Sequence, residues 1–398
     1  MSNNICYIAV AGSGKTTHLV RLGRDRLREL HNREAPCGRL AYLSFTINNQ
    51  QNLRDKIQDE IGLTSSVEVF GWYQFLLKTF IRPYKRDIIE SLYDTNVSIG
   101  FIEVPKIRDN GKCYLHYKKG DLKKKFLCGH NIYKDYIAEF AFLCIEKNKK
   151  SLSRYLHFVY DTIYIDEAQD LSGYDFEILK FLIERTNINV IIAGDPKQRT
   201  YVSAHLSKNK RYSFDSYCCE KINKDYIIID AQTLSYTHRC VESIASLASR
   251  ISPNPPTVTC QCQECLERRS AYTHNLRGVY WVAERHVANF IHETEATTLI
   301  WNKSRELLEG MSKVYNMGAV KGLERDAILL CPTEDMLKKL YNNSIELSEE
   351  TQAKFYVALT RPRYILAILV PNDFNQEVEG IEWYEPRISG VLFGKERE

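Results

Sequence analysis

Residues 5–17, with the sequence ICYIAVAGSGKTT, restrict the possible folds of this chain more than any other stretch. A short apolar segment runs into a Gly-Ser-Gly-Lys-Thr turn, and the apolar residues of positions 17–30 are compatible with a helix after it. Gly12 and Gly14 allow the backbone N–H groups to curl around phosphates, and the dipole of the following helix favours the same anions. We therefore predict a phosphate-binding loop.

In this loop, Lys15 is expected to reach the β- and γ-phosphates of a nucleotide, and the Thr16 hydroxyl is expected to bind Mg²⁺. Ala9 stands where the general pattern has its first glycine, so the formal match is incomplete. The alternative is a glycine-rich turn that carries a lysine by chance. The residues predicted to contact the nucleotide here are Ala11, Gly12, Ser13, Gly14, Lys15, Thr16 and Thr17.

The chain has 398 residues, enough for two or three domains, and its 44% hydrophobic and 26% charged residues allow full cores. The net charge of +4 only mildly favours a polyanionic partner. We find no secretory leader and no uninterrupted apolar run long enough to span a bilayer, so the expected location is the cytoplasm, with no membrane partner. The 12 scattered cysteines are expected to be reduced thiols rather than a disulfide framework.

Residues 40–45 form a compact apolar run and residues 48–57 look helical, which predicts a second parallel strand and its crossover. An aromatic-rich segment follows between positions 67 and 84 and includes Phe70 and Trp72. Aromatic rings at this density either stack on nucleic-acid bases or form core.

Lysines accumulate between positions 103 and 150, most densely at positions 118–125, and Tyr114, Tyr117 and Phe126 lie among them. Such a stretch suits a nucleic-acid groove, because lysines neutralise phosphates while rings stack on bases. A solvated surface insertion is the equal alternative.

Two further apolar strands end in acidic or polar loops. Residues 162–165 run into Asp166 and Glu167, where the first carboxylate is expected to hold Mg²⁺ and the second to orient or deprotonate the attacking water. Residues 190–193 lead into the sequence GDPKQ at positions 194–198. If this strand lies beside the first, Gln198 can sense the γ-phosphate.

These loops, with three segments of the second half, resemble the ordered motifs of superfamily 1A helicases, the UvrD/PcrA/Rep group. The matching stretches are residues 11–17, 44–46, 166–170, 194–198, 234–239 (LSYTHR), 320–324 (VKGLE) and 356–361 (YVALTR).

The resemblance implies an α/β fold with two RecA-like domains, each a parallel sheet flanked by helices. The expected division is domain 1A over residues 1–72 and 158–205, a small basic 1B-like insertion over 73–157, and domain 2A over 206–398. Only 82 positions separate Arg239 from Lys321, which predicts that the family's large 2B domain is absent or reduced.

The resemblance also implies ATP and Mg²⁺ as ligands. It implies that Arg239 and Arg361 direct their charge at the γ-phosphate, that Glu324 touches the ribose beside Gly322, and that His238 stacks on adenine. The catalytic set is then Lys15, Asp166, Glu167, Gln198, Arg239 and Arg361. The residues expected to contact single-stranded DNA are Phe45, Thr46, Phe70, Trp72, Tyr201 and Lys321.

Two departures from the family pattern concern the binding of ATP and of DNA. Only four residues precede Ile5, where the family has an adenine-recognition segment, so purine specificity is left open. Ser203 stands where the family has a tryptophan that stacks on DNA. One contact used for translocation is therefore expected to be missing.

Cys260, Cys262 and Cys265 lie close together in a proline-flanked segment. They can bind zinc if Cys240, Cys218, Cys219 or His274 supplies a fourth ligand, or they can be free thiols of a surface loop.

The expected function is that of an ATP-dependent DNA helicase or translocase, moving 3′ to 5′ by resemblance, in bacterial DNA repair or anti-phage defence. The alternative is a partner-controlled ATPase in a nuclease complex. In that interpretation the chain resembles the helicase-like subunit of anti-phage systems such as Gabija, whose partner is an OLD-family nuclease. A catalytically inactive scaffold is disfavoured because the residues needed for ATP hydrolysis are present.

Overall fold

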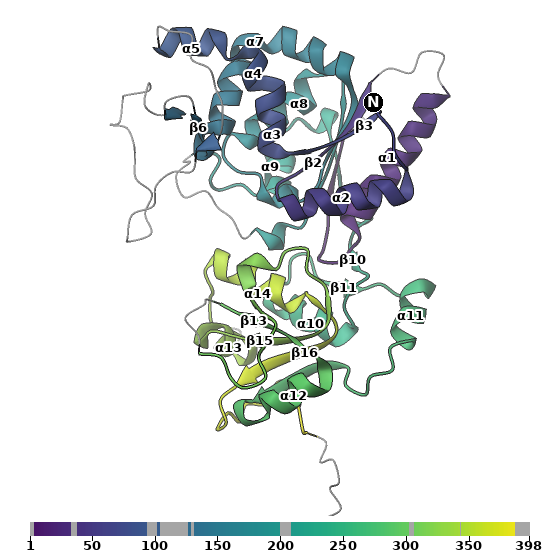
Figure 1. Cartoon of the computed structure of the whole chain (residues 1–398), viewed down its shortest axis with the longest axis vertical. Helices are drawn as coiled ribbons and strands as arrows, with labels where there is room; N and C mark the ends of the chain where they lie inside the picture. The colour runs from purple at the N-terminus through teal and green to yellow at the C-terminus, as the bar shows by residue number, and fades with distance from the viewer. Residues whose placement is uncertain are drawn as a thin grey trace, which may run out of the picture. The chain divides into compact units, whose positions relative to one another are not determined.

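The computed structural model describes residues 4–32, 38–93, 102–103, 126–128, 131–199, 208–301, 306–342 and 344–386. The chain forms two compact units, Met1–Ser235 and Tyr236–Glu398. Each unit is built around its own six-stranded sheet (Figure 1).

The sheet of the first unit is entirely parallel. Its strands lie in the spatial order β3 (Val67–Gly71), β2 (Arg39–Ser44), β7 (Tyr160–Ile165), β8 (Asn189–Gly194), β1 (Ile5–Ile8) and β9 (Ile228–Asp230). All four strands predicted from the sequence are present. β8 pairs directly with β1, as the expected position of Gln198 requires.

Successive residues of each strand face opposite sides of the sheet, so both faces need a cover. Ile163 and Ile165 belong to one core, whereas Tyr164 between them belongs to the other. Helices α1 (Lys15–His31) and α2 (Ile47–Glu60) cover the Tyr164 face (Figure 1). The opposite face carries α3 (Trp72–Leu76), α7 (Ile137–Val159), α8 (Asp175–Arg185) and α9 (Phe214–Lys221).

Short elements complete the first unit. A small sheet has the order β4 (Ile102–Glu103), β6 (Asn131–Tyr133) and β5 (Leu127–Cys128). The helical connections are η1 (Leu77–Ile81), α4 (Arg82–Tyr84), α5 (Arg86–Tyr93), η2 (Lys134–Tyr136), η3 (Ala168–Asp170), η4 (Pro196–Gln198) and η5 (Lys224–Tyr226).

The second unit repeats the parallel design. Its sheet has the order β14 (Val314–Asn316), β13 (Thr297–Ile300), β15 (Arg325–Cys331), β16 (Pro362–Val370), β12 (Gly278–Ala283) and β17 (Glu382–Trp383). Its helices are α10 (Glu242–Ile251), α11 (Gln263–Ser270), η6 (Glu284–His286), α12 (Val287–Thr294), η7 (Met317–Ala319), α13 (Glu334–Tyr341) and α14 (Glu349–Leu359). A separate parallel pair joins β10 (Tyr236–Thr237) to β11 (Val258–Thr259).

The predicted α/β class with two helix-flanked parallel sheets is confirmed, but the units divide the chain later than the predicted domain start at residue 206. β9 pairs with β1, which keeps the chain in the first unit until Ser235, 235 minus 205, or 30 residues further on. In the described part of residues 73–157, α7 and η1 share the core of the first sheet rather than forming a separate body. Among the described residues, no helix is both long and apolar enough to cross a membrane.

Candidate functional site

The loops after β1, β7 and β8 meet at one edge of the first sheet. The three strands are parallel and neighbours in the order β7, β8, β1, with Ile165 opposite Ile192 and Ile8 opposite Gly194. Because parallel strands present their carboxyl ends at the same edge, the sheet brings together three loops that lie far apart in the sequence. These loops carry Lys15, Asp166 and Gln198.

The loop after β1 has the geometry of an anion cradle. Gly12 and Gly14 have φ values of 72° and 80°, which residues other than glycine rarely adopt. Helix α1 begins directly afterwards at Lys15. The Ser13 hydroxyl is buried without a hydrogen-bond partner among the described residues. The Lys15 side chain is also largely buried, with 8% of the residue exposed. A buried cation, an unpaired hydroxyl and the start of a helix fit a bound phosphate.

Thr16 and Asp166 form the part of the site that suits a magnesium ion. The Thr16 hydroxyl donates to Asp166 Oδ2 at 2.7 Å, and the Glu167 N–H donates to Asp166 Oδ1 at 2.9 Å. Burial and the neighbouring Glu167 carboxylate raise the pKa of Asp166 to about 6, although Lys15 and the Thr16 hydroxyl favour its charged form. Mg²⁺ prefers such oxygen ligands, so the residues fit the ion that a nucleotide brings.

Glu167 is held in an unusual conformation next to Asp166. Its φ of 57° lies in the left-handed region, which costs free energy for a residue other than glycine. The Gln169 amide donates to Glu167 Oε2, and Gln169 Oε1 accepts from the Asp195 N–H at 3.0 Å. Gln169 thereby links the loop after β7 to the loop after β8.

Asp195 orders the third loop. It is fully buried; its Oδ1 accepts from the Lys197 N–H at 3.1 Å and its Oδ2 accepts from Gln198 Nε2 at 2.9 Å. Burial raises the pKa of Asp195, opposed by Lys15 and Lys197. Sequence reasoning included Gln169 and Asp195 in motifs without assigning them a role. The signal for Asp195 is its place directly after the buried strand β8, whereas Gln169 lies in η3 and is identified only by its hydrogen bonds.

Ala11 and Thr17 are the remaining predicted nucleotide contacts of this region. Ala11 is fully buried. The Thr17 hydroxyl accepts a hydrogen bond from Lys56 Nζ of α2 at 2.8 Å, so this side chain ties α1 to α2.

In the second unit, Arg239 and Glu324 form an ion pair. Arg239 Nε donates to Glu324 Oε1 at 2.9 Å, and Arg239 Nη1 donates to the Thr360 carbonyl at 2.9 Å. Burial opposes ionisation of Glu324, but Arg239, with help from Arg363 and Arg361, outweighs it and lowers the pKa of the carboxyl. The family resemblance implies that Glu324 contacts the ribose of a nucleotide. Here it binds one of the two predicted arginines.

Arg361 is more deeply placed than Arg239. The residue is 2% exposed, follows α14, and donates from Nε to the Val357 carbonyl at 2.9 Å. Lys321 and Gly322 occupy a turn closed by the bond from the Leu323 N–H to the Val320 carbonyl, with φ of 82° at Gly322. Arg239, Arg361 and Glu324 thus lie close to one another near the start of β16.

His238, which the resemblance predicts to stack on adenine, lies beside cysteine side chains in this structure. Its Nδ1 lies 3.3 Å from Cys265 Sγ, so the ring faces a group of cysteines. Burial and the adjacent Arg268 lower the pKa of the imidazole, which favours the neutral form. The sequence analysis named four other residues as possible fourth zinc ligands beside these cysteines and did not include His238.

Two of the predicted DNA-contacting rings are core residues in this structure. Trp72 is 1% exposed and its Nε1 donates to Asp175 Oδ1 at 2.7 Å. Phe70 is 7% exposed in the same core. Neither ring presents a free face to a base, so both take the core position that the sequence left open as the alternative to stacking. Phe45 is half-buried against Trp72, and Thr46 is exposed and caps α2 by accepting from the Asn49 N–H at 3.2 Å.

Several other predicted nucleic-acid contacts lie outside the described residues. They are Tyr201, Tyr114, Tyr117 and the lysines of positions 118–125. Ser203, where the family has a tryptophan, also lies outside them. Phe126 is described and is buried against Phe140 and Tyr136.

The buried Asp175 carboxyl makes the stability of this region depend on pH. Burial raises its pKa to about 7, although hydrogen bonds from Trp72 and Ser172 favour the ionised form. The unfolded chain has a carboxyl pKa of about 3.9. Because the pKa of Asp175 is higher in the folded than in the unfolded chain, its contribution to the free energy of unfolding is complete below about pH 4. This contribution is lost as the pH rises towards about 7.

We expect the free energy of unfolding of the wild type, minus that of Asp175→Asn, to fall by up to about 1.4 kcal/mol per pH unit between about pH 5 and 7. Above about pH 8 this difference should level off. Urea unfolding over this range measures it, with the exposed Asp25→Asn as the control. A difference independent of pH contradicts the assignment.

Comparisons with known proteins agree with the motifs. The model of the UvrD/REP helicase N-terminal domain family matches residues 80–203. Gabija protein GajB from Bacillus cereus (strain VD045) is 29% identical over 203 residues, which are 50% of this chain and 38% of that protein. This chain therefore aligns with well under half of that relative.

A solved structure of Pif1 helicase from Bacteroides, in complex with ADP-AlF3 and ssDNA, aligns over 97% of this chain and 89% of its own at 10% identity. The TM-score is 0.34, too low to support a structural argument, so the strand order itself defines the fold. The ordered motifs, the family match and the GajB relative support a superfamily 1 helicase.

Proposed function

We propose that this chain hydrolyses ATP and couples the hydrolysis to movement on single-stranded DNA. The observation that carries the proposal is the meeting of Lys15, Thr16 and Asp166 at one sheet edge, with 2.7 Å between Thr16 Oγ1 and Asp166 Oδ2. A cation, a hydroxyl and a carboxylate in this arrangement suit a nucleotide triphosphate with its magnesium ion.

The residues of the first unit divide the work. The loop N–H groups and Lys15 bind the β- and γ-phosphates, and Thr16 and Asp166 hold Mg²⁺, which neutralises charge on the phosphates when bound. Glu167 orients the attacking water and accepts its proton. Gln169 and Asp195 position Glu167 and Gln198 through the hydrogen bonds described above.

Arg239 and Arg361 supply positive charge from the second unit. In phosphoryl transfer such arginines stabilise the charge that develops on the γ-phosphate. Glu324 holds Arg239 through their ion pair. ATP would then compete with Glu324 for this guanidinium.

The DNA part of the proposal rests on the helicase family match and on the GajB relative. The family resemblance supplies the 3′ to 5′ direction. The name of the relative supports a role in anti-phage defence, with DNA repair as the other cellular setting. Among the predicted DNA contacts, Phe45, Thr46 and Lys321 are described and are not fully buried.

A second candidate is an ATPase whose activity is controlled by a protein partner, such as an OLD-family nuclease. Two observations favour it. Phe70 and Trp72 are buried, and Ser203 replaces a tryptophan, so three ring contacts to DNA are buried or missing. A motor that lacks base stacking holds a single strand weakly, because each stacked base is worth about 1–3 kcal/mol.

Unwinding of a tailed duplex by the purified chain separates the two candidates. The helicase proposal predicts ATP-dependent strand separation that requires a 3′ tail and is absent for a 5′ tail. If the wild type hydrolyses ATP but leaves both duplexes intact, the partner-controlled candidate is favoured. Glu167→Gln is the control for strand separation without hydrolysis.

A further inference from the structure

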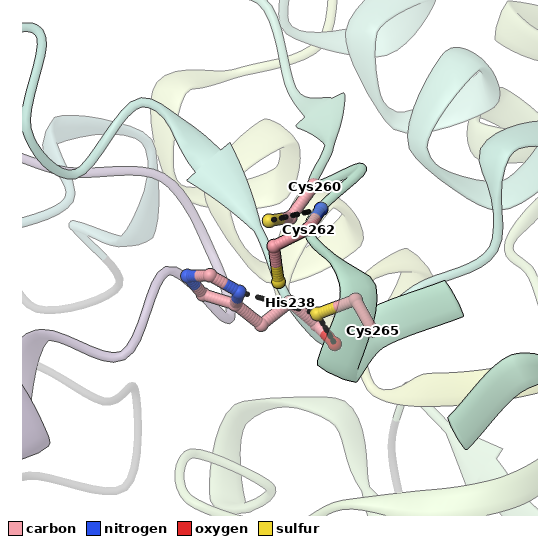
Figure 2. A group of neighbouring side chains, drawn as sticks. All are labelled: His238, Cys260, Cys262 and Cys265. Atoms are coloured by element: carbon pink, nitrogen blue, oxygen red, sulfur yellow. Dashed lines mark hydrogen bonds between the residues drawn. The ribbon is translucent and has the colours of Figure 1, made fainter. Parts of the chain in front are cut away.

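Four side chains of the second unit converge on one point (Figure 2). They are His238, Cys260, Cys262 and Cys265, and their ligand atoms all lie within 4.8 Å of one another. The three cysteines are free thiols. The predicted ATP chemistry uses none of these thiols.

The backbone explains why His238 meets cysteines that lie more than 20 positions further along the chain. β10 and β11 pair in parallel with Tyr236 opposite Val258 and Thr237 opposite Thr259. His238 and Cys260 follow these strands at adjacent ends, and the Cys260 N–H donates to the Thr237 carbonyl at 2.9 Å. The pairing of the two strands therefore brings the backbone of His238 close to that of Cys260.

The next two cysteines enter from the start of a helix. Cys262 is the N-cap of α11 and Cys265 lies in its first turn. Cys262 and Cys265 have the Cys-x-x-Cys spacing that is common in zinc-binding loops. The first turn of the helix brings the two side chains to the same side. Cys265 is buried, whereas Cys262 is exposed, so the group lies at the surface with one side closed.

We propose that His238, Cys260, Cys262 and Cys265 bind one Zn²⁺ ion as a structural site. Three thiolates and one imidazole are a donor set that selects zinc, and four protein ligands leave no position open for catalysis. With Zn–S bonds of about 2.3 Å, neighbouring ligand atoms of a tetrahedron lie about 3.8 Å apart. His238 Nδ1 and Cys265 Sγ are 3.3 Å apart, and no pair of the ligand atoms is more than 4.8 Å apart, which is about 1 Å wider than this spacing.

The surroundings compensate the charge of such a site. One Zn²⁺ with three thiolates has a net charge of −1, and Arg268 Nη2 lies 3.7 Å from Cys265 Sγ. Arg268 also donates to the His238 carbonyl, and Arg269 donates to the Cys260 carbonyl. The Cys262 N–H points to Cys260 Sγ at 3.4 Å. These donors stabilise ligand thiolates and hold the two ligand segments together.

The fourth ligand is not one of the residues that the sequence suggested. Cys240 is buried with its thiol towards the Thr360 carbonyl at 3.7 Å, and His274 contacts the Glu293 carbonyl at 3.3 Å. Cys218 and Cys219 belong to the first unit. Instead, the parallel pairing of β10 with β11 brings His238 to the cysteines. Strands of two residues leave no pattern in the sequence from which this pairing can be predicted.

The proposed ion has a consequence for the neighbouring motif. His238 directly precedes Arg239, so zinc would anchor the segment that carries this arginine to the start of α11. The zinc proposal itself does not depend on ATP hydrolysis, because its test measures metal and not turnover.

The test is the zinc content of the purified, tag-free chain, prepared under reducing conditions from zinc-containing medium and measured by inductively coupled plasma mass spectrometry. We expect about one zinc ion per chain. Cys260→Ser and Cys262→Ser should lose most of it. Cys219→Ser is the matched control, because Cys219 is exposed and lies outside the cluster. His238→Cys should keep the ion, since four thiolates also form a zinc site, whereas His238→Ala should bind it more weakly.

A second measurement needs no variant. The wild type, stripped of metal and reduced, is titrated with Co²⁺, and a tetrahedral thiolate site gives intense visible d–d bands that Zn²⁺ then abolishes. The proposal is overturned if the wild type contains no zinc and gives no such bands, or if Cys262→Ser retains as much zinc as Cys219→Ser. A disulfide within the cluster in the freshly isolated chain, found by non-reducing mass spectrometry, also overturns it.

Discussion

Glu167→Gln is expected to lower the ATP turnover number about 10²- to 10⁴-fold and to leave ATP bound to the protein, because the amide cannot accept a proton from water. Asp166 and Thr16 remain in place, so Mg²⁺ and the phosphates keep their ligands. Steady-state phosphate release and equilibrium binding of a fluorescent ATP analogue measure the two quantities separately.

Lys15→Ala is the informative companion of this variant. It removes the cation that contacts the phosphates, so both binding and turnover should fall. Glu90→Gln is the matched control for the carboxylate, because Glu90 lies on the surface of the first unit in a pair with Arg86. Turnover by Glu167→Gln at nearly the wild-type rate contradicts the role of Glu167 as the base.

Arg361→Ala is expected to lower the turnover number about 10³- to 10⁵-fold, the range measured for arginines that stabilise the transferred phosphoryl group. Binding of nucleotide to the first unit should be little changed. Arg285→Ala is the control, since Arg285 is an exposed arginine of the same unit whose contacts are with its neighbour His286 and with Asn372.

Arg361 is buried, so the variant needs a test of folding. Its Nε bond to the Val357 carbonyl is lost in Arg361→Ala, and thermal unfolding shows whether the second unit persists. Arg361→Lys keeps the charge and should recover part of the turnover if charge near the phosphate is the cause. A folded Arg361→Ala protein with unchanged turnover excludes Arg361 from the reaction.

The sequence predicted the loops of the first sheet well, because glycine spacing, strand length and a terminal carboxylate are local patterns with few solutions. Asp166 directly follows β7, Lys15 begins the helix after the glycine turn, and the position of β8 beside β1 is confirmed. It did not place residues 208–235 in the first unit, since three residues of β9 are too short a pattern to reveal their pairing.

Aromatic and histidine side chains were harder to predict. The indole of Trp72 is polar at one edge and apolar elsewhere, so from the sequence it suits stacking on a base or packing in a core equally well. Its hydrogen bond to Asp175, seen only in the structure, places it in the core. His238 lies within a motif that implies a nucleotide contact, and only the pairing of β10 with β11 brings it to Cys265. Long-range contacts of this kind have no signature in a single sequence.

ATP hydrolysis by the purified wild-type chain, measured with and without single-stranded DNA, tests the central claim most directly. We expect magnesium-dependent phosphate release that rises with single-stranded DNA and is nearly abolished by Glu167→Gln under both conditions. A folded wild-type chain that releases no phosphate in either condition, or one whose release survives in Glu167→Gln, contradicts the proposed site.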